Sequence, residues 1–176
     1  MKKLFAGLIF SLLLIFGAFI GSPYLAASNL QKAAMTGQAA ELEGKIDFPR
    51  VRERLKSQLT RALIREFEKD PSLRDNPFSS FGVLLATAMV DKLVDAYVTP
   101  EGLAAILAGA KPSEGSSKVS NSNIAYDYRW LGINSVVVDS QDPKLNKRGP
   151  SFVFERRGFT SWVLVGIELP EDFLTT

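Results

Sequence analysis

The stretch that decides the fold is KKLFAGLIFSLLLIFGAFI, residues 2–20. Two lysines precede an apolar run from Leu4 to Ile20, in which Ser11 is the one polar residue. As a helix rising about 1.5 Å per residue, the run is about 26 Å long, close to the roughly 30 Å hydrocarbon core of a bilayer. Residues 1–21 are therefore predicted to be a transmembrane anchor, with the basic end inside and the rest of the chain exported.

A cleavable signal peptide is the alternative interpretation of the same segment. Its apolar region is usually only about 7–15 residues long and ends at a site of the small-x-small type. The best candidate site, Ala26-Ala27-Ser28, lies beyond the end of the apolar run at Ile20. Both interpretations predict that the remainder of the chain is exported.

Composition narrows the classes of function. The 176 residues are 46% hydrophobic and 23% charged, which suits one globular domain behind the anchor. Lys2 and Lys3 supply the whole surplus charge, since removing them leaves 21 − 2 = 19 basic residues against 19 acidic ones. A nucleic-acid partner is therefore not expected.

The chain contains no Cys and no His, which excludes disulfides, thiol nucleophiles, Ser-His-Asp catalysis and the commonest zinc ligands. We expect no catalytic residues, no metal site and no cofactor.

The first part of the exported chain, residues 22–110, has helical periodicity. Ser22-Pro23 is typical of a helix start, and Asp47 precedes another as its cap. We expect helices over 23–35, 39–44, 48–69, 78–97 and from about 100 to 110. The helix over 78–97 is apolar on more than one side, which predicts deep burial.

The last part changes to a period of two. Residues 111–122 are rich in Ser, Gly and Pro and predict a loop, whereas 123–176 contain four short β-branched and aromatic runs. These predict antiparallel strands over 124–131, 135–139, 151–157 and 161–169. The short segments 132–134 and 157–160 are expected to be hairpin turns, and 141–150 a longer polar loop. In the last strand, Val163, Val165, Ile167 and Leu169 are expected on one face, and Trp162, Leu164 and Gly166 on the other. The predicted fold is α+β, with helices packed on one face of a four-stranded antiparallel sheet.

Four stretches carry a resemblance to a known family: Ser22–Tyr24, Asp47–Arg52, Leu93–Leu103 and Trp162–Pro170. They are similar to the bacterial domain-of-unknown-function family 2939, over nearly the whole exported chain. The resemblance implies a small protein with one N-terminal hydrophobic segment, and it implies no activity and no catalytic residues. The last strand also resembles the final strand of cone-shaped, cystatin-like or nuclear-transport-factor-like folds, which carries no function with it.

Aromatic residues are the first candidate site. Tyr126, Tyr128 and Trp130 alternate along one strand and so point the same way, and Trp162 lies on another strand. If their face meets the helices these rings are core; if it is open, they line a ligand pocket to which Tyr97 adds a further ring.

Arg50 and Arg52 are the second candidate site. They follow the Asp47 cap, so they lie in the first turns of a helix, where unpaired backbone N–H groups favour anions. The alternative is structural, with Asp47 as a cap and the arginines paired to strand carboxylates.

Two functions remain after these exclusions. The leading hypothesis is a non-enzymatic interaction module: a single-pass protein of the bacterial inner membrane whose C-terminal domain lies in the periplasm. It would bind another envelope or inner-membrane protein, or serve as an accessory subunit of a membrane complex. The alternative is a small-molecule or lipid-binding domain with a pocket between helices and sheet.

Overall fold

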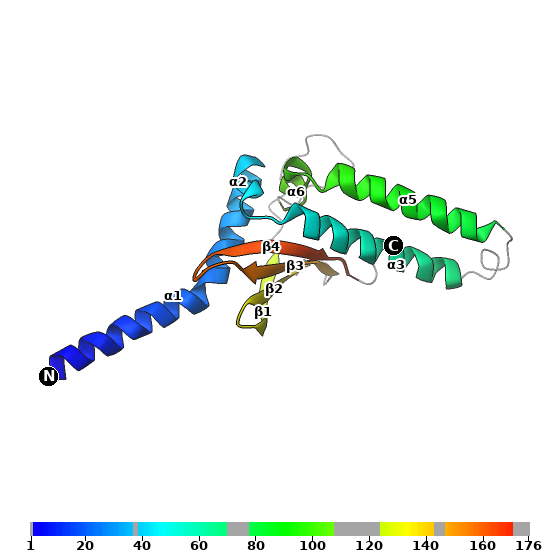
Figure 1. Cartoon of the computed structure of the whole chain (residues 1–176). Helices are drawn as coiled ribbons and strands as arrows, with labels where there is room; N and C mark the ends of the chain where they lie inside the picture. Colours follow the sequence, from blue (N-terminus) through cyan, green and yellow to red (C-terminus); the bar gives the residue numbers. More distant parts are fainter. Residues whose placement is uncertain (1, 37–38, 70–77, 108–123, 143–146, 171–176) are drawn as a thin grey trace.

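The architecture is α+β, as predicted, in a computed structural model that describes residues 2–36, 39–69, 78–107, 124–142 and 147–170 (Figure 1). Helices come first and strands follow. Their order along the chain is α1 (Lys2–Met35), α2 (Ala39–Glu43), α3 (Phe48–Lys69), α5 (Ser79–Tyr97), α6 (Pro100–Leu107), β1 (Ala125–Gly132), β2 (Ser135–Asp142), β3 (Lys147–Arg156) and β4 (Trp162–Glu168). The loop predicted over 111–122 lies outside the described residues.

Helix α1 is continuous where the sequence predicted a break at Ser22-Pro23. It runs unbroken from the apolar N-terminal segment into the domain, with Pro23 inside it. A proline has no N–H, so it cannot donate to the carbonyl four residues earlier, which here belongs to Phe19. That carbonyl accepts instead from Ser22 Oγ at 2.8 Å and from Arg156 Nη2 at 3.3 Å. The predicted helix start was wrong because these two donors replace the missing backbone bond.

The four strands form an antiparallel meander in the order β1-β2-β3-β4. The short turns after Gly132 and Arg156 are hairpins, as predicted. Strands β2 and β3 extend through Asp142 and from Lys147, so they take up most of the loop predicted over 141–150. One edge is covered by the segment before α3, because Lys45 O accepts from Leu164 N and Asp47 N donates to Leu164 O, each at 2.9 Å.

The main core lies between the helices and one face of the sheet. It joins Leu30 of α1, Leu42 of α2 and Val51 and Leu55 of α3 to inward-facing strand residues, including Val136, Val138, Phe152, Phe154, Trp162, Leu164 and Ile167. A smaller cluster on the other face contains Val137, Val153 and Val165.

A bulge in β4 corrects the predicted faces of the last strand. Phe154 pairs with Leu164 while Val153 pairs with Gly166, so Val165 is an extra residue. Such a residue resets the alternation of side chains. Ile167 therefore joins Leu164 in the main core rather than sharing a face with Val165.

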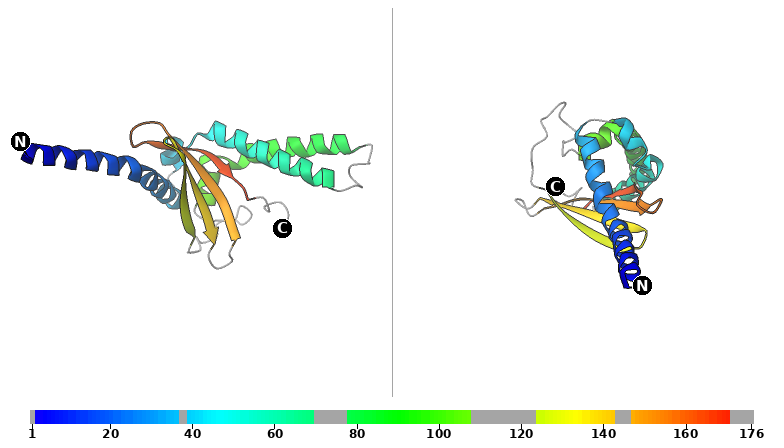
Figure 2. Two further views of the ribbon diagram at one scale, coloured as in Figure 1. Left: turned by 90° about the horizontal axis from the view of Figure 1, so that it is seen from below. Right: turned by 90° about the vertical axis from the view of Figure 1, so that its left-hand side faces the viewer.

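Helices α3 and α5 form a hairpin that extends beyond the sheet (Figures 1 and 2). Helix α3 packs on β4, and α5 lies alongside α3. The hairpin and the N-terminal end of α1 lie at opposite ends of the molecule in both views. Helix α5 therefore lacks the deep burial that its composition predicted, and along it only Val94 is buried among the residues described.

Candidate functional site

The first notable site is the junction at which α1 enters the domain. Trp162, the first residue of β4, is 5% exposed and donates its indole N–H to Ser22 Oγ at 2.8 Å. The Ser22 hydroxyl in turn donates to Phe19 O. This chain of hydrogen bonds links the sheet to the helix at the turn that Pro23 leaves incomplete.

Arg156 completes the junction from the end of β3. Its guanidinium carbon lies 3.7 Å from the centre of the Phe19 ring and 4.2 Å from that of Trp162, both in cation–π range. The same group donates to the carbonyls of Phe19, Ile133 and Phe159. Burial lowers the pKa of Arg156, although an arginine stays charged at any physiological pH. One side chain thus ties α1 to both hairpin turns at this end of the sheet.

Three of the five candidate pocket residues contact α1, namely Tyr126, Tyr128 and Trp162, and Trp130 lies against Trp162. Gln31 donates to the Tyr126 hydroxyl at 3.1 Å, and the rings of Tyr24 and Tyr128 lie 4.2 Å apart. Trp130 meets Trp162 edge-to-face at 5.8 Å. Burial raises the pKa of Tyr126 and of Tyr128.

The space beside these tyrosines is small. A cavity of about 40 Å³ is lined by Tyr126, Tyr128 and residues of α1, β2 and β3. It is large enough for about one water molecule. The fifth candidate, Tyr97, lies half exposed at the C-terminal end of α5.

A larger groove of about 480 Å³ lies between α1 and the sheet, next to the junction. Small residues of α1 form one wall, where a side-chain carbon added at Gly17 or Gly21 would have no neighbour within 4 Å. Trp162, Phe154 and Lys45 contribute to the other wall. The groove combines a largely apolar lining with the cationic side chain of Lys45.

Arg50 and Arg52 both have partners within the domain. Asp47 caps α3, accepting from Arg50 N at 3.3 Å, and the Arg50 guanidinium binds both oxygens of Glu155 at 2.6 and 2.8 Å. This bond raises the pKa of Arg50 and lowers that of Glu155. Arg52 donates to Val98 O at 3.1 Å, just after α5. The Asp47 cap and the pairing of Arg50 with a strand carboxylate agree with the structural alternative, whereas Arg52 bonds to a backbone carbonyl and not to a strand carboxylate. Within the described ranges, no group of three or more acidic residues is placed to hold a metal ion.

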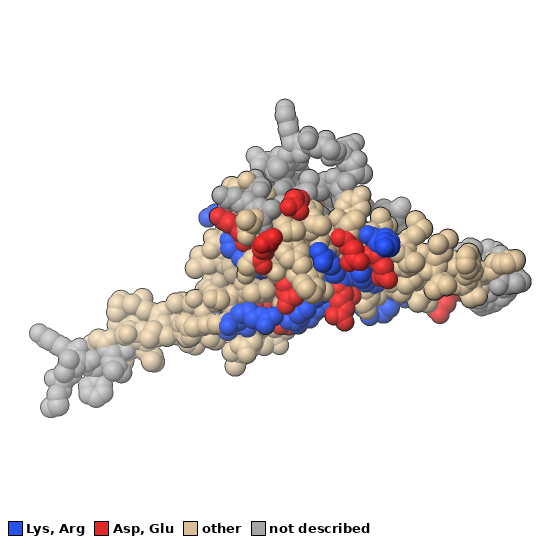
Figure 3. All heavy atoms as spheres, turned by 45° about the horizontal axis from the view of Figure 1, so that its top comes forward, with Lys and Arg blue, Asp and Glu red and all other residues tan. Residues whose placement is uncertain are grey.

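The sequence did not reveal a further site, which is an exposed apolar surface on α5. We call it the α5 apolar face and define it as Phe81, Leu84, Leu85, Met89 and Leu93. Its side chains are between 51% and 67% exposed. A fully exposed large apolar side chain has roughly 200 Å² of surface, so the exposed fractions of these five add up to roughly 600 Å² of apolar surface. This area is at the upper end of the range for the largest apolar patch on an ordinary monomer. On the face seen in Figure 3, the charged side chains gather over the middle of the molecule, and few of them lie on the outer part of the hairpin. The helical periodicity predicted an apolar helix here but carried no signal of what covers it.

Comparison with known proteins adds one assignment. The sequence model of a protein family of unknown function, DUF2939, matches residues 12–106, more than half of the chain. The chain belongs to this family. The matched region includes α1 from residue 12 onward and the α3–α5 hairpin, and it ends before the sheet. Searches of curated proteins and of solved structures found no match.

Helix α1 agrees with the prediction that the N-terminal segment can cross a membrane. Helix α1 contains a segment, Ile9–Ala34, that is long and apolar enough to cross a membrane, and 11% of its most apolar window is buried against the rest of the protein. A single such helix near the N-terminus is compatible with a single-pass anchor and also with a signal sequence.

Proposed function

We propose that this DUF2939 protein is a membrane-tethered interaction module of the bacterial envelope. In this proposal α1 anchors the chain in the inner membrane, the domain lies in the periplasm, and the α5 apolar face binds another envelope or inner-membrane protein. The absence of Cys and His from the sequence supports a binding role over an enzymatic one. The balance of charges supports a protein partner over a nucleic acid.

The observation that carries the proposal is the exposure of the α5 apolar face. Its roughly 600 Å² approaches the roughly 800 Å² that each partner contributes to a standard protein–protein interface. The inner end of the hairpin is held by polar bonds, since Lys56 pairs with Asp95 at 2.8 Å and Arg52 donates to Val98 O. The hairpin is therefore secured to the domain at one end and offers its apolar side chains along the other.

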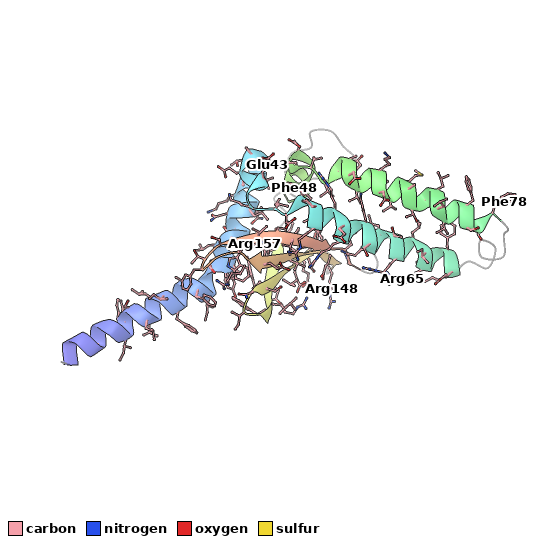
Figure 4. All side chains as sticks on the ribbon, in the orientation of Figure 1. Glu43, Phe48, Arg65, Phe78, Arg148 and Arg157 are labelled. Carbon is pink, nitrogen blue, oxygen red and sulfur yellow. The ribbon has the colours of Figure 1, made fainter. Side chains whose placement is uncertain are left out.

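The position of the hairpin favours a protein over the anchor's own bilayer as the binding partner. The N-terminal end of α1 and the tip of the hairpin, near Phe78 in Figure 4, lie at opposite ends of the molecule. If α1 crosses the bilayer, the hairpin extends away from it into the periplasm. An apolar helix face at that distance from lipid fits a helix or groove of another protein.

The test is site-specific photo-crosslinking in living cells, with the cross-linking residue at Leu85 or, as a matched control, at Arg65 on the exposed side of α3. We expect a discrete adduct from position 85 and none from position 65. Adding Met89→Glu should abolish the adduct, while the unfolding curve stays unchanged because Met89 is 58% exposed. Absence of an adduct from every position of the α5 apolar face would overturn the proposal. A periplasm-dependent reporter fused to the C-terminus tests the topology separately.

The groove beside the junction favours a second candidate function, the binding of a lipid or small apolar ligand. Its volume of about 480 Å³ falls in the range of small-ligand sites. Gly21→Leu would fill the groove, because nothing lies within 4 Å of a side-chain carbon placed at Gly21. Native mass spectrometry of the full chain should then show a ligand retained by the wild type and lost from the variant. An unliganded wild type would exclude this candidate.

A further inference from the structure

The two hairpin turns at one end of the sheet carry large apolar side chains. Leu131 and Ile133, at the β1–β2 turn, are 58% and 71% exposed, and Phe159, in the β3–β4 turn, is 57% exposed. Tight turns usually carry Gly, Asn, Asp or Ser at such positions. Leu131, Ile133 and Phe159 are called the turn cluster below.

Both turns lie where the anchor enters the domain. The rings of Phe159 and Phe19 are 5.5 Å apart. The Arg156 guanidinium donates to Ile133 O at 3.3 Å, to Phe19 O at 3.3 Å and to Phe159 O. Carbonyls from both turns and from α1 therefore surround one side chain, so the turns lie beside the helix turn that contains Phe19.

That helix turn is also the end of the apolar run. Residues 4–20 span about 26 Å as a helix, so Phe19 and Ile20 reach the boundary between hydrocarbon and headgroups. We propose that the turn cluster inserts into the lipid at this boundary, on the side of the membrane that carries the domain. The proposal rests on the membrane anchoring assumed in the proposed function, and it is independent of what the α5 apolar face binds.

The basic residues next to the turn cluster fit a lipid surface. Arg156 is the last residue of β3. Arg157, the next residue, pairs with Asp47 at 3.1 Å and is exposed beside the β3–β4 turn (Figure 4). Basic side chains border the domain near the emerging apolar anchor (Figure 3). Apolar side chains next to basic ones match the layers of a membrane interface, with phosphate groups above the acyl chains. The protein thus touches the bilayer with the sheet as well as with the helix.

The chain's lack of Cys makes a direct depth measurement possible. Single cysteines at Ile133 and Phe159 would be labelled with a polarity-sensitive fluorophore in the full-length protein, reconstituted in phosphatidylethanolamine–phosphatidylglycerol vesicles. Phe16→Cys, in the anchor, is the lipid control, and Arg65→Cys, on the hairpin, is the water control. Circular dichroism of each variant checks that the exposed substitutions leave the fold intact.

We expect the labels at 133 and 159 to show blue-shifted emission and quenching by nitroxide lipids, as at position 16. Quenching by aqueous iodide should be several-fold weaker than at position 65. If both labels match position 65 while the chain resists extraction from the vesicles at alkaline pH, the protein is anchored but the turn cluster is outside the lipid, which overturns this inference alone. If alkaline extraction releases the chain, the membrane anchoring itself fails and the inference fails with it.

Discussion

The junction hydrogen bond from Trp162 to Ser22 makes a quantitative prediction for Trp162→Phe. The substitution removes a buried hydrogen bond of 2.8 Å, worth about 1 kcal/mol. It also leaves a small cavity in place of part of the indole, which costs about 1–2 kcal/mol more at a site that is 5% exposed. The free energy of unfolding should fall by about 2–3 kcal/mol, which corresponds to roughly 5–10 °C in Tm for a chain of this size.

Trp130→Phe is the matched control. The same atoms are removed, but Trp130 is only partly buried and its indole does not bond to Ser22. We expect a loss of about 1 kcal/mol there, as for an average substitution. Urea unfolding of the full-length protein in detergent, followed by circular dichroism, measures both variants.

A double-mutant cycle with Ser22→Ala isolates the bond itself. Ser22→Ala alone leaves the buried indole N–H without its acceptor, at a cost of about 1–3 kcal/mol. The double variant should lose less than the sum of the single variants, by about 1 kcal/mol, since the two side chains are in contact. Strict additivity, or equal losses from Trp162→Phe and Trp130→Phe, would refute the assigned role of this hydrogen bond.

Two further predictions concern the helices. Glu155→Gln should lower stability by about 1 kcal/mol at neutral pH, a modest value because the Arg50 partner is about one-third exposed. The bond to Arg50 holds the pKa of Glu155 below its ordinary 4.5, so the stabilisation is present above that pH and is lost as the pH falls through the lower folded-state pKa; urea unfolding at pH 7 and below pH 4 should show the gap between wild type and variant closing in acid. Gly102→Ala should cost about 2–3 kcal/mol, because its new carbon would collide with Tyr97 O. Gly44→Ala meets nothing within 4 Å and should stay close to wild type in thermal unfolding. Equal melting temperatures for the two variants would contradict the steric argument.

Features set by neighbouring residues were predictable from the sequence. Helix α3 has the predicted bounds, because a side chain that caps a helix acts on N–H groups within three residues, as Asp47 does on Arg50. The hairpin turns after Gly132 and Arg156 were also predictable, because each depends on a few neighbouring residues between two strands. Local chemistry was sufficient to predict the structure wherever a group and its partner lie within the same turn.

Features set by distant partners were not predictable. Taken alone, Pro23 indicates a helix start, and it is accommodated inside α1 only because Arg156, far along the chain, donates to the carbonyl that proline cannot reach. The extra residue Val165 likewise depends on the register of β3 and β4, and a single bulge moves Ile167 to the other face. Of the candidate pocket, the strand alternation correctly grouped Tyr126 with its neighbours. No sequence rule places Tyr97 with or apart from them.

Burial was the least predictable property of the candidate sites. An apolar helix and an apolar turn have the same composition whether they face a protein core, another protein or lipid. The α5 apolar face and the turn cluster became recognisable only through their positions, one on a hairpin that extends beyond the sheet and the other beside Phe19 of the continuous helix α1. Since α1 is continuous through Pro23 and bonded there to Arg156, the junction sets the direction of the hairpin relative to the anchor. We therefore propose the bilayer as the cover of the turn cluster, which lies beside α1, and another protein as the cover of the α5 apolar face.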